Sequence, residues 1–179
     1  MRFEVTRVLD SIERRLCTDP TVARAVVDLS PIVRQKELDG GRTASLLRLG
    51  LVIDALGQSL SDQGAKVYVV LDRALLADLE LSSNEKMTLR RWSDDGLVDT
   101  LEEVDDRVLE VAACTGLPVI SRDDFARFAN RHPWLTGAPE RFLIPVPGMG
   151  GAVLMSRPSP GGQQSAQPVL DAATRAVLA

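Results

Sequence analysis

The chain has 179 residues, 45% of them hydrophobic, which suits one globular core with appended ends. Its net charge of −4 at pH 7 argues against a protein that coats polyanions, because such binding depends on an excess of Lys and Arg. With one histidine and two cysteines, the chain lacks ligands for a structural zinc site, so any bound metal is expected to be a hard cation held by oxygen atoms.

The first 24 residues are predicted to form a helical extension. Apolar residues recur at helical spacing between Val5 and Leu16, with charged residues on the other face. This pattern predicts a helix that packs on the domain, on a protein partner or on a second copy of the chain. It does not resemble a signal peptide. The two cysteines are far apart, which favours a reducing, cytoplasmic setting, and no apolar run reaches membrane-spanning length.

From residue 25 onward, predicted strands alternate with predicted helices. The strands are expected at residues 25–29, 66–71, 96–101 and 117–121, and the helices at 44–60, after a capping box at 82–85, at 105–115 and at 124–130. Alternation at this spacing predicts an α/β fold whose parallel sheet has helices on both faces.

The carboxyl-terminal part has a weaker pattern. Two short strands are predicted at residues 141–145 and 152–155, with a loop at 146–151 between them, so residues 136–155 form a short β extension. Pro, Gly, Gln and Ser dominate from Ser156 onward. Residues 156–179 are therefore expected to be a flexible tail with a transient helix near 170–178.

Several carboxylates are expected to converge at one edge of the sheet. Asp28 ends the first strand, Asp123 follows the fourth, and Asp105 and Asp106 open the helix that leads into the fourth. Active sites of α/β sheets lie at the carboxyl ends of the strands. Crowded carboxylates repel one another, and a divalent cation is their natural counter-charge. Because such a cation activates water and binds phosphate oxygens, the cluster indicates phosphodiester hydrolysis.

Each of these acids also has an ordinary structural explanation. Asp105, Asp106 or Asp123 could cap the helix that follows it, and Asp72 could cap a turn at residues 74–76. Asp28 is harder to explain in this way, because it follows an apolar strand directly.

Four motifs together resemble a PIN-like nuclease domain. They are Val26-Val27-Asp28, the Gly41-Arg42 turn before a long helix, Val104-Asp105-Asp106-Arg107, and Val119-Ile120-Ser121-Arg122-Asp123-Asp124-Phe125. The resemblance is closest to the NYN branch, which includes the Regnase-type ribonucleases; the bacterial VapC toxins are more distant relatives. It covers residues 25–130, and a nuclease domain is predicted at 25–135.

This resemblance implies both a fold and a metal site. The fold would be a three-layer α/β/α sandwich with a mainly parallel sheet in the order 3-2-1-4-5. The protein would cleave single-stranded RNA with Mg²⁺ or Mn²⁺. The implied catalytic residues are Asp28, Asp105, Asp106 and Asp123, and the implied metal ligands are Asp28, Asp106, Asp123 and Asp124.

The chain departs from the family pattern at two places. Leu29-Ser30-Pro31 stands where NYN nucleases have a Ser-Asn pair after the first acid, and Arg127 stands at a position that is commonly acidic. Both changes affect the expected metal site.

Residues near the same edge are candidates for RNA binding. Arginine pairs with phosphate through two parallel hydrogen bonds. The candidates are Ser30, Arg42, Arg107 and Arg122, with Arg73 and Arg127 nearby. The alternative is that these arginines are solvated or paired within the protein, as Arg107 could be with Glu103 or Glu110.

Three functions remain open from sequence. The favoured one is a metal-dependent endoribonuclease, acting as a toxin or in RNA turnover. The second is a catalytically degenerate PIN-like module that binds protein or RNA, which the changes at Pro31 and Arg127 favour. The third is a phosphorylated receiver domain, whose acidic pair after the first strand is not matched by Leu29-Ser30.

Overall fold

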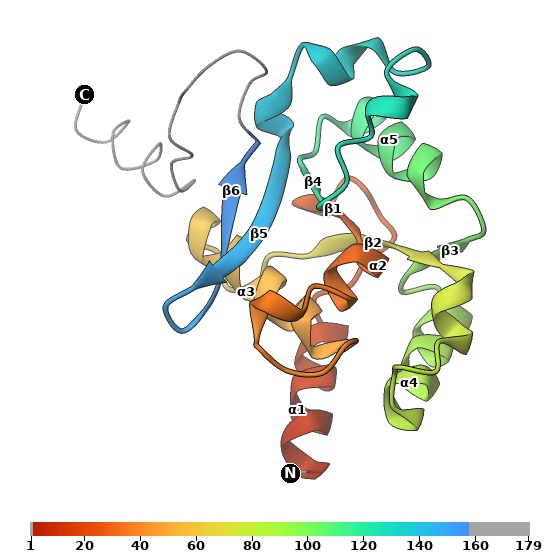
Figure 1. The fold of residues 1–179 in the computed structure, drawn as a ribbon, viewed down its shortest axis with the longest axis vertical. Helices are drawn as coiled ribbons and strands as arrows, with labels where there is room; N and C mark the ends of the chain where they lie inside the picture. Colours follow the sequence, from red (N-terminus) through yellow and green to blue (C-terminus); the bar gives the residue numbers. More distant parts are fainter. Residues whose placement is uncertain (1, 158–179) are drawn as a thin grey trace.

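The computed structural model describes residues 2–157 (Figure 1). The predicted tail lies outside the described residues from 158 onward, including its helix near 170–178. Its first predicted residue, Ser156, instead ends a strand.

A six-stranded sheet forms the centre of the molecule, with the order β3-β2-β1-β4-β5-β6. The strands are β1 Ala25–Asp28, β2 Val67–Asp72, β3 Asp99–Leu101, β4 Val119–Ile120, β5 Phe142–Gly148 and β6 Gly151–Ser156. The first five are parallel, and β6 pairs with β5 in the antiparallel direction. The predicted order 3-2-1-4-5 is therefore confirmed, with β6 added at the edge.

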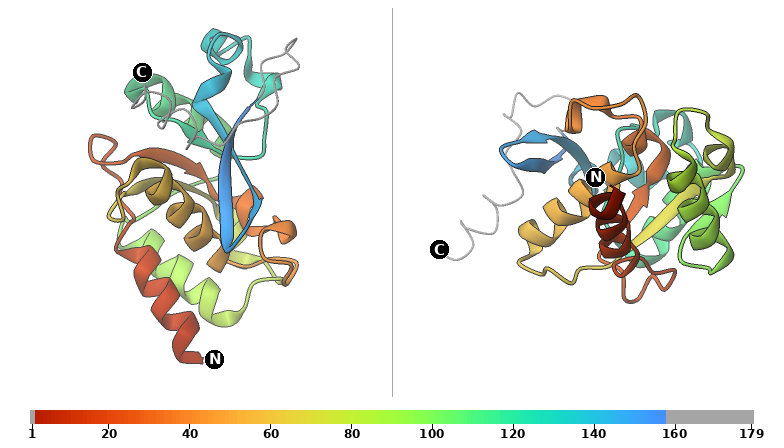
Figure 2. Two further views of the ribbon diagram at one scale, coloured as in Figure 1. Left: turned by 90° about the vertical axis from the view of Figure 1, so that its left-hand side faces the viewer. Right: turned by 90° about the horizontal axis from the view of Figure 1, so that it is seen from below.

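Helices cover both faces of this sheet, as predicted for a three-layer sandwich. The helices are α1 Arg2–Glu13, α2 Leu29–Val33, α3 Leu47–Leu60, α4 Ser83–Asp94 and α5 Val104–Thr115. The first four share one buried core with Val27 and Val69, whereas α5 shares the other with Val26 and Val70. This alternation follows from the two-residue period of a strand. The helix α1 lies along α3, with its amino-terminal end directed away from the sheet (Figure 2). None of the helices in the described range is long and apolar enough to cross a membrane.

Two strand predictions differ from the structure. The strand predicted at 96–101 is only Asp99–Leu101, because Gly96 adopts a left-handed φ of 70° and the Leu97 amide bonds to the Trp92 carbonyl at the end of α4. The loop predicted at 146–151 is wrong. β5 continues to Gly148 and pairs with β6 across a tight turn that contains Gly150 at a φ of 82°.

The helix predicted at 124–130 is also wrong. Asp123 and Asp124 accept hydrogen bonds from the amides of Phe125 and Ala126, and Phe125 adopts a left-handed φ of 53°. These local bonds compete with helix formation. Only a 3₁₀ turn at Ala126–Phe128 remains.

The predicted capping box is confirmed, and its glutamate also joins two helices. Glu85 accepts the amide of Ser82 at 2.9 Å and, across the chain, the amide of Leu46 at 2.9 Å, next to the start of α3. The guanidinium of Arg42 donates to the same carboxylate at 2.8 Å. Burial alone would raise the pKa of Glu85, but these hydrogen bonds hold it below its usual value. Glu85 therefore stays ionised and connects the amino-terminal ends of α3 and α4.

We predict that Glu85→Ala lowers the free energy of unfolding by about 2–4 kcal/mol, because it leaves buried amides without an acceptor. Denaturant unfolding at pH 7 measures this loss. Glu110→Ala is the matched control, since Glu110 is exposed and loosely paired, and it should change stability by less than about 0.5 kcal/mol. Equal effects of the two substitutions would contradict this role for Glu85.

Candidate functional site

Four carboxylates gather where the central strands end. Asp28 ends β1, which lies between β2 and β4, and its side chain is buried with 3% exposed. Asp72 ends β2, Asp123 follows β4, and Asp105 lies in the first turn of α5. The negative charges of the last three act on Asp28. We call Asp28, Asp72, Asp105 and Asp123 the carboxylate edge.

The environment of Asp28 disfavours its charged form. Burial raises the pKa of Asp28 to about 7, and the charges of Asp105, Asp123 and Asp72 act in the same direction. One interaction opposes them: the Ser121 hydroxyl donates to Asp28 Oδ2 at 2.9 Å. A buried carboxylate with like charges around it and a single hydroxyl donor lacks a counter-charge.

Ser121 positions two members of the carboxylate edge at once. Its hydroxyl donates to Asp28, and its oxygen also accepts the Asp123 amide at 3.0 Å. Asp123 in turn accepts the Phe125 amide at 2.8 Å, which closes a local turn, and the helix that it was expected to cap is not formed. Sequence reasoning assigned no role to Ser121. The only available signal was its place as the last residue of a predicted strand.

The loop after β4 is also held from the other side. Arg157, at the end of β6, donates to the backbone carbonyls of Asp123 and Asp124, and its guanidinium lies over the ring of Phe142 at 4.9 Å. Phe125 is fully buried against Phe142, with ring centroids 5.9 Å apart. The added β6 strand therefore supports the position of Asp123.

Arg127 bridges two members of the carboxylate edge. Its Nη2 atom bonds to Asp105 and lies 3.5 Å from Asp123 Oδ2. The side chain is 65% exposed. Asp105 and Asp123, both expected from the sequence to be catalytic, thus share the single positive charge of a side chain of the same protein.

The other two predicted metal or catalytic acids have partners outside the carboxylate edge. Asp106 pairs with Arg131 at 2.6 Å and lies 3.5 Å from His132 Nε2. Asp124 is exposed, and its carboxylate accepts the Ala126 amide at 2.9 Å. Neither is among the acids whose charge acts on Asp28. Of the predicted acidic pair, Asp105 belongs to the carboxylate edge and Asp106 does not. A catalytic or metal-binding role for Asp106 and Asp124 stays a prediction.

Most predicted RNA-binding residues have partners within the protein. Arg42 bonds to Glu85, and Arg107 bonds to Asp99 at 2.7 Å and lies 3.6 Å from Glu110. The alternative of a pair with Glu110 is therefore confirmed.

Three residues remain better placed to reach a ligand at this edge. Arg122 is exposed and only loosely paired with Glu37, at 3.6 Å. Ser30 is half-buried in the first turn of α2, the helix that starts directly after Asp28. The side chain of Arg73 is exposed and has no hydrogen bond or ion pair within the described part of the chain.

The carboxylate edge has ligand atoms of the type that suits a hard cation, but their present positions do not form a cation site. Its ligand atoms are all carboxylate oxygens, the type that Mg²⁺ prefers. Between residues 2 and 157, however, no three acidic, histidine or cysteine side chains are placed to hold a metal ion. The guanidinium of Arg127 lies against two of the four acids. A cation therefore requires these side chains to move.

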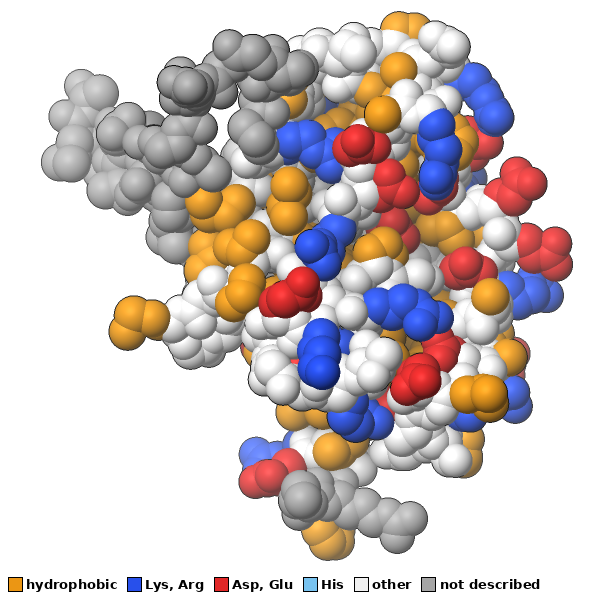
Figure 3. Space-filling view, viewed as in Figure 1, with side chains coloured by type: hydrophobic (Ala, Val, Ile, Leu, Met, Phe, Trp, Pro, Cys, Tyr) orange, Lys and Arg blue, Asp and Glu red, His pale blue; other side chains and the backbone are white. Residues whose placement is uncertain are grey.

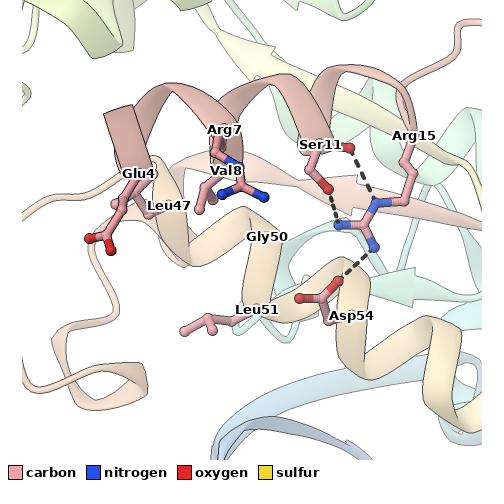
Figure 4. Close-up of a pocket in the computed structure, with 9 residues that line it drawn as sticks. All are labelled: Glu4, Arg7, Val8, Ser11, Arg15, Leu47, Gly50, Leu51 and Asp54. Carbon is pink, nitrogen blue, oxygen red and sulfur yellow. Dashed lines mark hydrogen bonds and ion pairs between the residues drawn. The ribbon is translucent and has the colours of Figure 1, made fainter. Parts of the chain in front are cut away.

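Two surface features lie outside the carboxylate edge. An open pocket of about 570 Å³ is lined by residues of α1 and α3 and by Arg15, which pairs with Asp54 at 2.6 Å (Figure 4). None of the predicted site residues lines it. On the face shown in Figure 3, basic side chains are interspersed with acidic ones and do not gather in one patch.

Comparison with known proteins supports the fold. No family model matched the chain, and no curated protein matched it significantly. Two structures of nuclear protein-only RNase P 2 (PRORP2) from Arabidopsis thaliana are similar, each with a TM-score of 0.57. One is 18% identical and covers 77% of this chain and 31% of its own; the other is 16% identical, with 89% and 37% covered. The chain thus spans about a third of that protein's length. At this identity the likeness concerns the fold alone: the chain has a PIN-like α/β fold, whereas its placement in the Regnase-type or VapC-like branch stays a prediction.

Proposed function

We propose that the protein is a metal-dependent endoribonuclease that cleaves single-stranded RNA. One observation carries the proposal: a buried carboxylate, Asp28, lies at the end of the central strand beside Asp72, Asp105 and Asp123. The PIN-like fold and its likeness to an RNase P support the nuclease assignment. On sequence grounds alone, we extend the proposal to a cytoplasmic enzyme that acts as a toxin or in RNA turnover.

The carboxylate edge has the properties expected of a cation site. Burying a carboxylate among like charges is costly unless a counter-charge is present, so the arrangement favours a bound Mg²⁺ or Mn²⁺. Such a cation supplies an activated water and neutralises charge on the phosphate. Asp28 and Asp123 are its best-positioned ligands, because Ser121 fixes both relative to each other.

The residues around the edge have separate tasks in this proposal. Arg73 directly follows Asp72 in the sequence, and Arg122 directly follows Ser121. Both arginines are exposed. Their guanidinium groups are suited to bind RNA phosphates on either side of the cleaved bond. Ser30, two residues after Asp28 in the sequence, is suited to contact one of these phosphates as well.

We predict that purified protein cleaves unstructured RNA only when Mg²⁺ or Mn²⁺ is present. Asp28→Asn and Asp123→Asn should each lower the cleavage rate at least about 100-fold, the scale seen when a group that stabilises the transition state is removed. Gel analysis of a labelled single-stranded RNA measures the rate. Asp54→Asn is the control, because Asp54 is an arginine-paired acid on α3, and it should retain full activity. Cleavage in excess EDTA, or full activity of Asp28→Asn, would contradict the proposal.

The pKa of Asp28 gives a second prediction, on stability. Because the folded-state pKa is about 7 and the ordinary value is 3.8, folding favours the protonated form. Its stabilisation is complete below pH 4 and is lost as pH rises through 7. In EDTA, wild-type protein should therefore lose up to about 4 kcal/mol relative to Asp28→Asn between pH 4 and pH 8.

Denaturant unfolding of both proteins across this range measures the difference. Asn keeps the shape of a protonated carboxyl group and accepts the same Ser121 hydroxyl, so it serves as the pH-independent reference. Saturating Mg²⁺ at pH 8 should narrow the gap, because a cation stabilises the ionised form. A gap that does not change with pH would show that Asp28 has no raised pKa.

A second function has one observation in its favour. The Arg127 contacts with Asp105 and Asp123 give those acids a counter-charge without a cation, as expected of a catalytically degenerate module that binds protein or RNA. A protein partner or second copy bound through α1 belongs to this alternative. Absence of both cleavage and cation binding would select it.

A further inference from the structure

We propose that Arg127 competes with the divalent cation for Asp105 and Asp123, so that its guanidinium must leave before the cation binds. This inference rests on the proposed function, because it concerns the same site. It explains why a carboxylate edge with four acids contains no ready-made three-ligand arrangement in the described structure.

The position of one nitrogen atom suggests this competition. Nη2 of Arg127 contacts Asp105 Oδ2 and Asp123 Oδ2 together. The two acids come from different elements, α5 and the loop after β4. A positive group that touches both oxygens occupies the space that a shared cation needs. Arg127 and the cation therefore cannot use these oxygens simultaneously.

Arg127 is held weakly enough to be displaced. Within residues 2–157, the two carboxylates are its only hydrogen-bond partners, and its side chain is 65% exposed. Its remaining contact is with the ring of Phe128, 5.1 Å from the guanidinium carbon. Exposed ion pairs contribute little stability, whereas a divalent cation carries twice the charge.

Release of Arg127 has a consequence for RNA binding. The freed guanidinium stays next to the carboxylate edge, where a phosphate provides two oxygens for it to bind. RNA that binds Arg127 therefore weakens its hold on Asp105 and Asp123. By linkage, RNA and cation each increase the affinity of the other.

Arg131 provides a matched control in the same segment. It also lies against the Phe128 ring and pairs with an acid of α5, but that acid is Asp106, outside the carboxylate edge. Removing Arg131 changes the local charge by the same amount without vacating the proposed cation position.

Isothermal titration of metal-free protein with Mn²⁺ tests the competition without relying on cleavage. We predict that Arg127→Ala binds Mn²⁺ about two- to fivefold more tightly than wild type, the range that corresponds to losing one exposed ion pair. Arg131→Ala should change the affinity much less. Arg127→Gln is a second variant that keeps a polar side chain without the positive charge, and it should behave as Arg127→Ala does. Circular dichroism checks that all variants are folded.

The possible results distinguish a failure of this inference from a failure of the proposed function on which it rests. Equal Mn²⁺ affinity of wild type and Arg127→Ala overturns the competition and leaves the cation site in place. The same increase in Arg131→Ala overturns it too, because the effect would then reflect net charge alone. Absence of Mn²⁺ binding in every variant overturns both proposals. Tight Mn²⁺ binding without RNA cleavage contradicts the proposed function while the competition stands.

Discussion

The hydrogen bond between Ser121 and Asp28 is the interaction on which the candidate site depends. It joins the ends of two neighbouring strands, β1 and β4, and the same hydroxyl oxygen positions the Asp123 amide. Without it, Asp28 would be a buried carboxylate with only like charges nearby. Around this contact, Phe125 and Arg157 fix the loop that carries Asp123. The fold thus supports a local arrangement that is electrostatically unfavourable by itself, as is common at functional sites.

Arginines neutralise the acids at this end of the sheet to different degrees. Asp106 is paired with Arg131 and Asp105 with Arg127, whereas Asp28 has only a hydroxyl. Asp28, the most buried of the four acids of the carboxylate edge, therefore has no counter-charge. This difference gives the site two states in our account: a resting state in which Arg127 is bound, and a loaded state in which a cation replaces it. RNA would favour the second state.

Sequence patterns predicted the parts of the fold that depend on periodicity and local capping. The alternation of strands and helices, the Ser82–Glu85 capping box and the position of Asp28 all followed from them. The strand order came instead from the resemblance to PIN-like nucleases. The sequence patterns failed where a local hydrogen bond or a long-range contact determines the structure. The carboxylates of Asp123 and Asp124 replace a predicted helix with a tight loop, and β5 extends because β6 pairs along its length.

The arginines show the same limit within the site. The spacing of Asp105 and Asp106 could not reveal which of them lies near Asp28. Their partners, Arg127 for Asp105 and Arg131 for Asp106, are more than 20 positions away in the sequence. Arg42 was predicted to face RNA, yet its partner is Glu85 on α4. Ser121 went unrecognised because its bond to Asp28 forms only when β1 and β4 become neighbours. Such long-range pairing is not encoded in any local motif.

A crystal structure of the protein with Mn²⁺ tests the central claim most directly. Anomalous scattering locates Mn²⁺ independently of the protein atoms. Our account predicts a peak within coordination distance of the Asp28 and Asp123 carboxylates, about 2.0–2.4 Å, with the Arg127 side chain turned away from Asp105. Crystals at millimolar Mn²⁺ with no peak at the carboxylate edge, and with Arg127 still bridging Asp105 and Asp123, would contradict it.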